Sequence, residues 1–131
     1  MKEPIWLERV VLETVHLELL SIYGGLEGIR DEGLLDSALG RPEQLFAYGE
    51  PDLFDLATSY AYGIVRHHPF LDGNKRAGFM AAYTFLIQNG WRIFAKEEEV
   101  VLMTIGLAAG ELQPEGYAMW LRENCKSEKG S

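Results

Sequence analysis

The sequence is poor in cysteine, in basic residues and in long apolar runs, and each shortage excludes a class of protein. Its one cysteine, Cys125, has no partner for an internal disulfide, which fits a reducing compartment. The 12 basic residues stand against 20 acidic ones, a net charge of −8, so the chain lacks the basic face of a general nucleic-acid binder. No apolar run approaches the roughly 20 residues that span a bilayer, and no signal peptide opens the sequence. We therefore expect a cytoplasmic protein with no direct DNA binding and no membrane segment.

The chain also lacks internal repeats, linkers and the Cys/His spacing of a structural zinc site. Its 131 residues, 47% of them hydrophobic, are enough to form one core. The sequence therefore predicts a single domain over residues 1–131, with a polar and disordered tail at 126–131.

The sequence does contain a polar cluster, residues 68–76, directly before an apolar stretch from Ala77 to Ile87. The cluster thus lies where a loop becomes a helix. The first N–H groups of a helix are unpaired there, and the helix dipole favours an anion. The cluster reads His68-Pro69-Phe70-Leu71-Asp72-Gly73-Asn74-Lys75-Arg76.

Three positions of the cluster suit a base beside a metal-bound phosphate. Histidine is the side chain that titrates near neutrality, so His68 is the predicted catalytic base. Asp72 offers hard carboxylate oxygens, which suit Mg²⁺ bound together with a phosphate. Gly73 has no Cβ and lets a ligand approach the backbone.

The remaining polar positions are predicted to bind phosphate. Asn74 can donate to phosphate oxygens, Arg76 can bind a phosphate through two parallel hydrogen bonds, and Lys75 supplies a point charge. Together these groups indicate phosphoryl or nucleotidyl transfer. The alternative is a pair of turns followed by an N-cap, with no ligand. Two cations placed against the helix dipole favour the ligand, because a bound anion would offset them.

Hydrophobic periodicity predicts an all-α protein, a compact bundle of six to seven helices around a central buried helix. The helix after the polar cluster is apolar on every side and is the predicted centre. Asp52 is the predicted N-cap of the most amphipathic helix. The predicted helices cover residues 6–22, 31–39, 52–67, 77–87, 96–109 and a last segment from 114, with a short strand at 91–94.

Residues 40–51 are predicted to be irregular, since Gly40 and Pro42 end the preceding helix. Phe46 and Tyr48 are aromatic residues two positions apart in this stretch. They either anchor a plain loop or belong to a short extended flap that binds a target segment along its edge. His16 lies off the apolar face of the first helix and is expected to be a surface or boundary residue.

Residues 68–76 resemble the signature of the Fic/Doc superfamily, His-x-Phe-x-(Asp/Glu)-(Gly/Ala)-Asn-(Gly/Lys)-Arg. At position 75 the sequence resembles the Doc branch, the death-on-curing toxins, which have lysine there. Fic proteins that transfer AMP have glycine at that position. The resemblance covers roughly residues 28–125 and includes Gly28–Leu39, Arg41-Pro42 and Asn89-Gly90-Trp91.

The resemblance implies the all-α Fic/Doc fold and a toxin that acts as a protein kinase with ATP and Mg²⁺. The implied target is a threonine of elongation factor Tu, which receives the γ-phosphoryl group, and translation then stops. His68 is implied to take the hydroxyl proton and Asp72 to hold Mg²⁺. The implied ATP-binding residues are Gly73, Asn74, Lys75 and Arg76.

Members of this family often carry an inhibitory motif, Ser/Thr-x-x-x-Glu-(Gly/Asn), which this sequence lacks. Its Glu-Gly pairs, Glu27-Gly28 and Glu115-Gly116, are preceded at the Ser/Thr position by Tyr23 and Glu111. We therefore expect a separate antitoxin whose C-terminal segment folds onto an apolar groove of this protein. Two other functions stay open, namely AMP transfer to a protein hydroxyl and a nucleotide- or partner-binding module without turnover.

Overall fold

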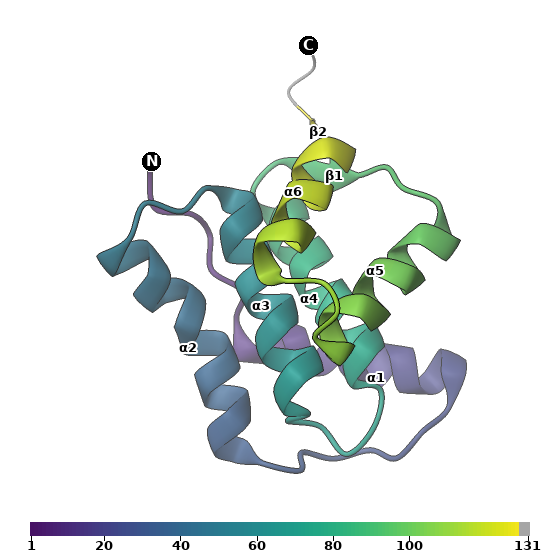
Figure 1. The fold of residues 1–131 in the computed structure, drawn as a ribbon. Coiled ribbons are helices and arrows are strands. Elements are labelled where there is room, and N and C mark those ends of the chain that lie inside the picture. The colour runs from purple at the N-terminus through teal and green to yellow at the C-terminus, as the bar shows by residue number, and fades with distance from the viewer. Residues whose placement is uncertain (129–131) are drawn as a thin grey trace.

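The computed structural model describes residues 1–128, which form six helices and one pair of short strands (Figure 1). None of these helices combines the length and the apolar character needed to span a membrane. The elements are α1 (Arg9–Tyr23), α2 (Glu32–Tyr48), α3 (Leu53–His67), α4 (Asn74–Gln88), β1 (Trp91–Ile93), α5 (Glu97–Ala109), α6 (Pro114–Asn124) and β2 (Cys125–Ser127).

Helices α3 and α4 form the centre of the bundle (Figure 1). The α3 helix packs against α2, α4, α5 and α6, while α4 also contacts α1 and β1. Asp52 caps α3 as predicted, since its Oδ1 accepts the N–H of Asp55 at 2.9 Å and its own N–H donates to Asp55 Oδ2. The all-α bundle with a buried helix after the polar cluster is confirmed, and α3 shares the central place.

The two central helices lie close together at Gly78 of α4. A Cβ at this position would lie 2.5 Å from Cγ1 of Val65 and 3.2 Å from the carbonyl oxygen of Ala61, both on α3. Val65 is fully buried and β-branched, so its side chain has little freedom to move away. The missing side chain of Gly78 therefore sets the spacing between the C-terminal half of α3 and the start of α4.

Replacing Gly78 by alanine is expected to lower the free energy of unfolding. The clash costs about 1–3 kcal/mol, while the better helix propensity of alanine returns only about 1 kcal/mol. Urea denaturation measures the difference. The matched control is Gly40→Ala in α2, where a Cβ meets nothing within 4 Å. That control is expected to stabilise the protein by about 0.4–1 kcal/mol, and an equal loss in both variants would contradict the packing argument.

The prediction of an irregular connection or flap at residues 40–51 is wrong for residues 40–48, and only residues 49–51 form an irregular connection. Helix α2 continues to Tyr48 with a buried Pro42 inside it. Phe46, beyond the proline, meets Trp6 edge to face with ring centroids 5.6 Å apart. Packing against the rest of the core thus outweighs the local preference of glycine and proline to end a helix.

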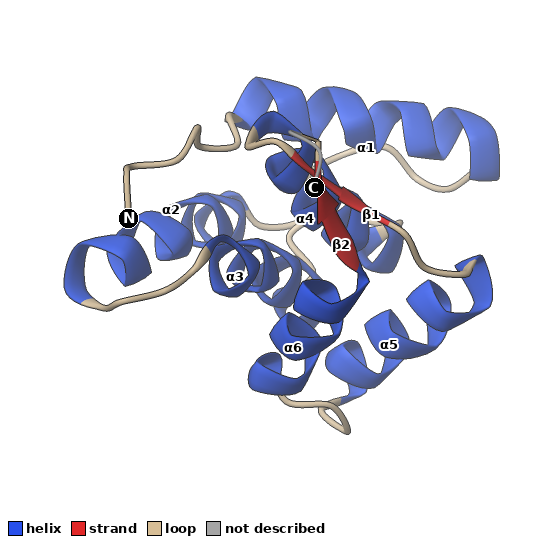
Figure 2. Cartoon of the chain, turned by 90° about the horizontal axis from the view of Figure 1, so that it is seen from above, coloured by secondary structure: helices blue, strands red, loops and turns tan. Residues whose placement is uncertain are grey.

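The predicted disordered tail is also corrected in part. Cys125–Ser127 form β2, which lies beside β1 (Figure 2) and pairs with it antiparallel. In this register Trp91 lies opposite Ser127. The pairing extends beyond the strands, because the N–H of Glu128 donates to the carbonyl of Gly90 at 2.9 Å. The edge of β1 thus supplies hydrogen-bond partners for the main chain of residues 125–128. The polar composition of this segment does not reveal that pairing. Residues 129–131 of the predicted tail lie outside the described residues.

Candidate functional site

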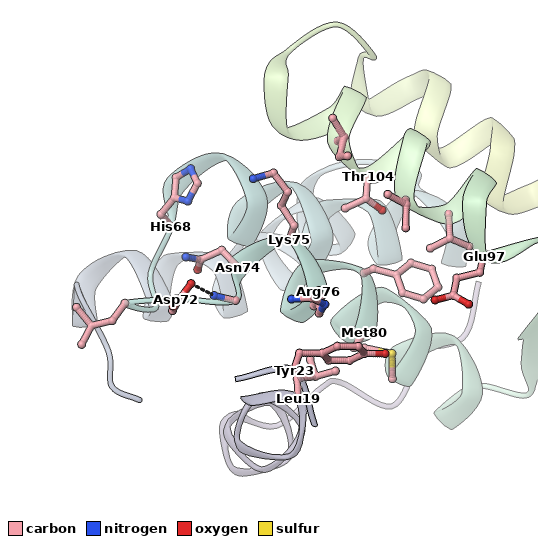
Figure 3. A pocket seen from close by; sticks show the side chains of 16 residues that line it. Leu19, Tyr23, His68, Asp72, Asn74, Lys75, Arg76, Met80, Glu97 and Thr104 are labelled. Carbon is pink, nitrogen blue, oxygen red and sulfur yellow. Dashed lines mark hydrogen bonds between the residues drawn. The ribbon is translucent and has the colours of Figure 1, made fainter. Parts of the chain in front are cut away.

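A cleft of about 630 Å³ opens beside the N-terminus of α4, between α1 and α5 (Figure 3). All six predicted site residues line it: His68, Asp72, Gly73, Asn74, Lys75 and Arg76. The rest of the wall is mostly apolar, with Glu97 and Thr104 of α5 as its polar members. The apolar side chains are Leu19, Tyr23, Leu71, Phe79, Met80, Val100, Val101 and Ile105. The fold therefore brings the whole predicted site to one concave surface.

The N-terminus of α4 has the properties of an anion site. Gly73 caps the helix in a left-handed conformation, with φ 73° and ψ 21°, and no side chain caps the helix. Within the described residues, no acceptor bonds the backbone N–H groups of Asn74, Lys75 and Arg76. The first turn contains no acidic residue. Three donors and the positive end of the helix dipole are therefore free to bind an anion.

Two cations follow at the same helix end. The Arg76 guanidinium lies over the ring of Tyr23 from α1, 4.1 Å from its centroid, an arrangement visible in Figure 3. Lys75 is exposed and lines the cleft. No salt bridge among the described residues includes either side chain. Both charges therefore remain available to an anionic ligand.

The carboxylate of Asp72 is held by main-chain donors on both oxygens. Its Oδ1 accepts the N–H of Gly73 at 3.0 Å, and its Oδ2 accepts the N–H of Leu26 at 3.2 Å. Each carboxylate oxygen can accept more than one partner, so coordination capacity remains. The described residues contain no cluster of three or more acidic, histidine or cysteine ligands. A single exposed carboxylate fits Mg²⁺ of the kind that is held mostly by phosphates and water.

The amide of Asn74 has a structural task that the sequence did not reveal. Its Oδ1 accepts the N–H of Phe70 at 3.1 Å and its Nδ2 donates to the carbonyl of Phe70 at 3.0 Å. The residue is 8% exposed. The side chain therefore closes the loop between Phe70 and α4. Donation of this amide to phosphate stays a prediction, while the backbone N–H of the same residue is free.

The adjacent histidines His67 and His68 point to different places. His68 is exposed and lines the cleft, whereas the Nε2 of His67 lies 3.2 Å from Nη1 of Arg41. An arginine only donates, so this nitrogen accepts and is unprotonated. Burial, followed by the charges of Arg41, Arg66 and His68, lowers the pKa of His67. Of the two rings, only His68 is placed to act as a base in the cleft.

His16 is the main site residue that sequence reasoning missed. The side chain is 3% exposed and stacks on Phe70, with ring centroids 3.8 Å apart and planes at 16°. Its Nε2 lies 2.8 Å from the carbonyl oxygen of Asp72, which can only accept. The expectation of a surface or boundary residue is therefore wrong, because the buried face of α1 runs through Leu12 and His16. No local pattern indicates the loop that covers this ring.

Removing the His16 side chain is expected to loosen the loop at residues 68–74. The alanine variant loses the ring stack and leaves a carbonyl without its donor, which costs about 1–3 kcal/mol of unfolding free energy. Urea denaturation measures the loss. His16→Gln keeps a donor of similar reach and is expected to retain part of the stability. Equal unfolding free energies for His16→Ala and the unmodified protein would contradict this role.

Comparison with known proteins agrees with the geometry. A model of the Fic/DOC family matches residues 6–86. The chain is 37% identical over 112 residues to "Protein kinase doc" of Escherichia phage P1, which covers 85% of this chain and 88% of that relative. It is 43% identical over 76 residues to "Toxin Doc" of Mycolicibacterium smegmatis, which covers 56% of this chain and 58% of that relative. The family match includes the whole polar cluster and all of α4 except its last two residues.

Proposed function

This chain belongs to the Fic/DOC family, and on that premise we propose that it is the toxin of a toxin–antitoxin pair that acts as a protein kinase. It transfers the γ-phosphoryl group of ATP to a hydroxyl of a target protein. The observation that carries the proposal is the cleft itself, where the His68 imidazole and the free N-terminus of α4 share one surface. The names of the relatives, a protein kinase and a toxin, support the same activity.

His68 is the proposed general base. Its ring takes the proton of the target hydroxyl while the hydroxyl oxygen forms a bond to the γ-phosphorus. The bond from that phosphorus to the bridging oxygen breaks, and ADP leaves. A positioned base contributes about 10²–10⁴ to such a rate. The proposed unit is one domain, residues 1–131, because side chains from α1, α4 and α5 all line the cleft.

The phosphates are proposed to bind at the N-terminus of α4. The free backbone N–H groups of Asn74, Lys75 and Arg76 donate to phosphate oxygens, and Gly73 permits their close approach. The stack on Tyr23 orients the Arg76 guanidinium, which reduces the freedom lost on binding. Asp72 is the proposed ligand of Mg²⁺, which neutralises charge on the phosphates when bound.

Lys75 is the residue proposed to select phosphoryl transfer over AMP transfer. Its side chain lines the cleft directly beside the free N–H groups. A lysine there fills space that a glycine would leave open for an α-phosphate at the reactive position. ATP is therefore proposed to bind in the sense that presents its γ-phosphate to His68.

The proposed target is a threonine of elongation factor Tu, and the proposed site of action is the cytoplasm, where translation takes place. The proposed partner is a cognate antitoxin whose C-terminal segment folds onto the apolar wall of the cleft. That wall includes large exposed side chains, since Tyr23, Val101 and Ile105 are 55%, 49% and 46% exposed. An amphipathic segment bound there would also cover the N-terminus of α4.

The activity can be tested with ATP labelled at either the α- or the γ-phosphate. The purified protein is incubated with Mg²⁺ and each label in an extract that contains elongation factor Tu. Label from the γ-position alone, on a band of that factor's size, is the expected result, and chelation of Mg²⁺ is expected to abolish it. Label from the α-position would instead indicate AMP transfer. Retention of ATP without labelling of any protein would favour a binding module.

A further inference from the structure

The backbone of His68 adopts an uncommon conformation. With φ 50° and ψ 60°, it is left-handed, and no other non-glycine residue among those described has a positive φ. Such a conformation is unfavourable for a residue with a Cβ, and it persists only where the surroundings hold it. The strain thus falls on the residue that carries the proposed base, and some contact must support it.

The usual support of a left-handed helix end is only partly present here, because the N–H of His68 donates to the carbonyl of Ile64 at 3.1 Å but the residue after it cannot donate. His68 ends α3, and a backbone N–H just beyond a helix commonly donates back to its last carbonyls. The next residue is Pro69, which has no N–H. Among the described residues, no backbone N–H donates to the carbonyls of His67 and His68, so these oxygens are open to a donor from another segment or to water.

Arg30, from the loop between α1 and α2, supplies that donor. Its Nε donates to the carbonyl of His68 at 2.6 Å, and its Nη2 donates to the carbonyl of His67 at 2.7 Å. No salt bridge among the described residues includes this guanidinium. Both donors lie in one rigid plane, so the pair of bonds fixes the direction of two successive carbonyls.

The main chain around Arg30 is itself attached to the polar cluster. The N–H groups of Arg30 and Asp31 donate to the carbonyl of Pro69 at 2.7 and 3.1 Å. Next to them, Ile29 forms an antiparallel bridge with Phe70. The guanidinium therefore approaches α3 from a segment already held in register, which leaves it little freedom to take another position.

We propose that Arg30 is a positioning residue for His68, holding the left-handed backbone that directs the imidazole into the cleft. The proposal rests on the proposed function for its catalytic consequence, but its structural part does not. Arg30 does not line the cleft, so it acts through His68 and not on the nucleotide. A shift of about 1 Å in a reacting group can lower a rate on the order of 10²-fold.

The test compares Arg30→Ala and Arg30→Lys with the unmodified protein. In Arg30→Ala we expect kcat of γ-phosphoryl transfer to fall on the order of 10²-fold, with KM for ATP changed by less than about twofold. Arg30→Lys keeps one donor and is expected to recover part of kcat. The matched control is Arg41→Ala, which removes a guanidinium that contacts the ring of His67 and no main-chain carbonyl of α3. The control is expected to keep the kcat of the unmodified protein.

A second measurement needs no activity. The NMR Cα chemical shift and HN–Hα coupling of His68 report its backbone conformation, and both are expected to move in Arg30→Ala but not in Arg41→Ala. Unchanged values would overturn the proposal, and so would changed values with an unchanged kcat. If the unmodified protein transfers no phosphoryl group, the proposed function fails. The NMR comparison still tests whether Arg30 maintains the left-handed backbone conformation of His68. Arg30→Gln replaces the alanine variant if the latter does not fold.

Discussion

Replacing His68 by alanine is expected to lower the rate of γ-phosphoryl transfer by about 10²–10⁴-fold and to abolish toxicity in growing cells. Among the described residues that line the cleft, His68 carries the only imidazole, so alanine removes the proposed base. Nucleotide binding is expected to persist, because the free N–H groups of Asn74, Lys75 and Arg76 are untouched. Single-turnover transfer of the γ-label measures the rate, and equilibrium binding of ATP measures the affinity.

The matched control for this experiment is the neighbouring histidine. His67→Ala removes a ring that contacts Arg41 and Tyr62 and does not line the cleft. Its rate is expected to stay close to that of the unmodified protein. Undiminished transfer in His68→Ala would exclude the base role, and an equal loss in both variants would point to a general disturbance of the α3 terminus.

Truncating Phe85 to alanine is expected to lower the free energy of unfolding by about 3–5 kcal/mol. This α4 side chain is fully buried, with its ring 5.1 Å from that of Tyr60 on α3 and 6.3 Å from that of Trp6. The cavity left between the rings of Tyr60 and Trp6 cannot close easily, because these rings belong to two separate segments. A domain of this kind is stabilised by about 5–15 kcal/mol in total, so the loss is severe and urea denaturation measures it.

Phe94 provides the control for that truncation. It is 56% exposed and its ring faces the ammonium group of Lys126 at 5.2 Å. Its replacement by alanine removes an exposed cation–π contact and is expected to cost less than about 1 kcal/mol. If Phe85→Ala cost no more than Phe94→Ala, the assignment of the α3–α4 contact as the centre of the core would be wrong.

The candidate site was largely readable from one stretch of sequence. The chemistry of residues 68–76 depends on residue types at fixed spacing, and a loop followed directly by a helix keeps neighbours in sequence close in space. All six predicted residues accordingly line one cleft. The residues that hold this loop were not predicted, because Arg30 and His16 contact it across 38 and 56 positions of sequence.

Arg30 had a weak signal in the sequence and His16 had none. The segment Gly28–Leu39 was part of the family resemblance, so Arg30 belonged to a stretch with more than chance similarity. Nothing in that similarity indicated that its guanidinium bonds the carbonyls of α3. His16 lies off the predicted apolar stripe and was therefore expected at the surface or boundary, whereas α1 in fact turns this ring toward Phe70. Helix periodicity gives the spacing of a face but not which face another segment covers.

The sequence by itself determined the local features, which include the capping of α3 by Asp52, the apolar character of α4, and the clustering of His68, Asp72 and Arg76. These depend on interactions between residues a few positions apart. The tertiary structure decided the rest: that Pro42 stays inside α2, that Cys125–Ser127 pair with β1, and that His68 is held in a left-handed conformation. Each of these outcomes depends on packing or hydrogen bonds from distant segments, which outweigh local preferences of about 1–3 kcal/mol.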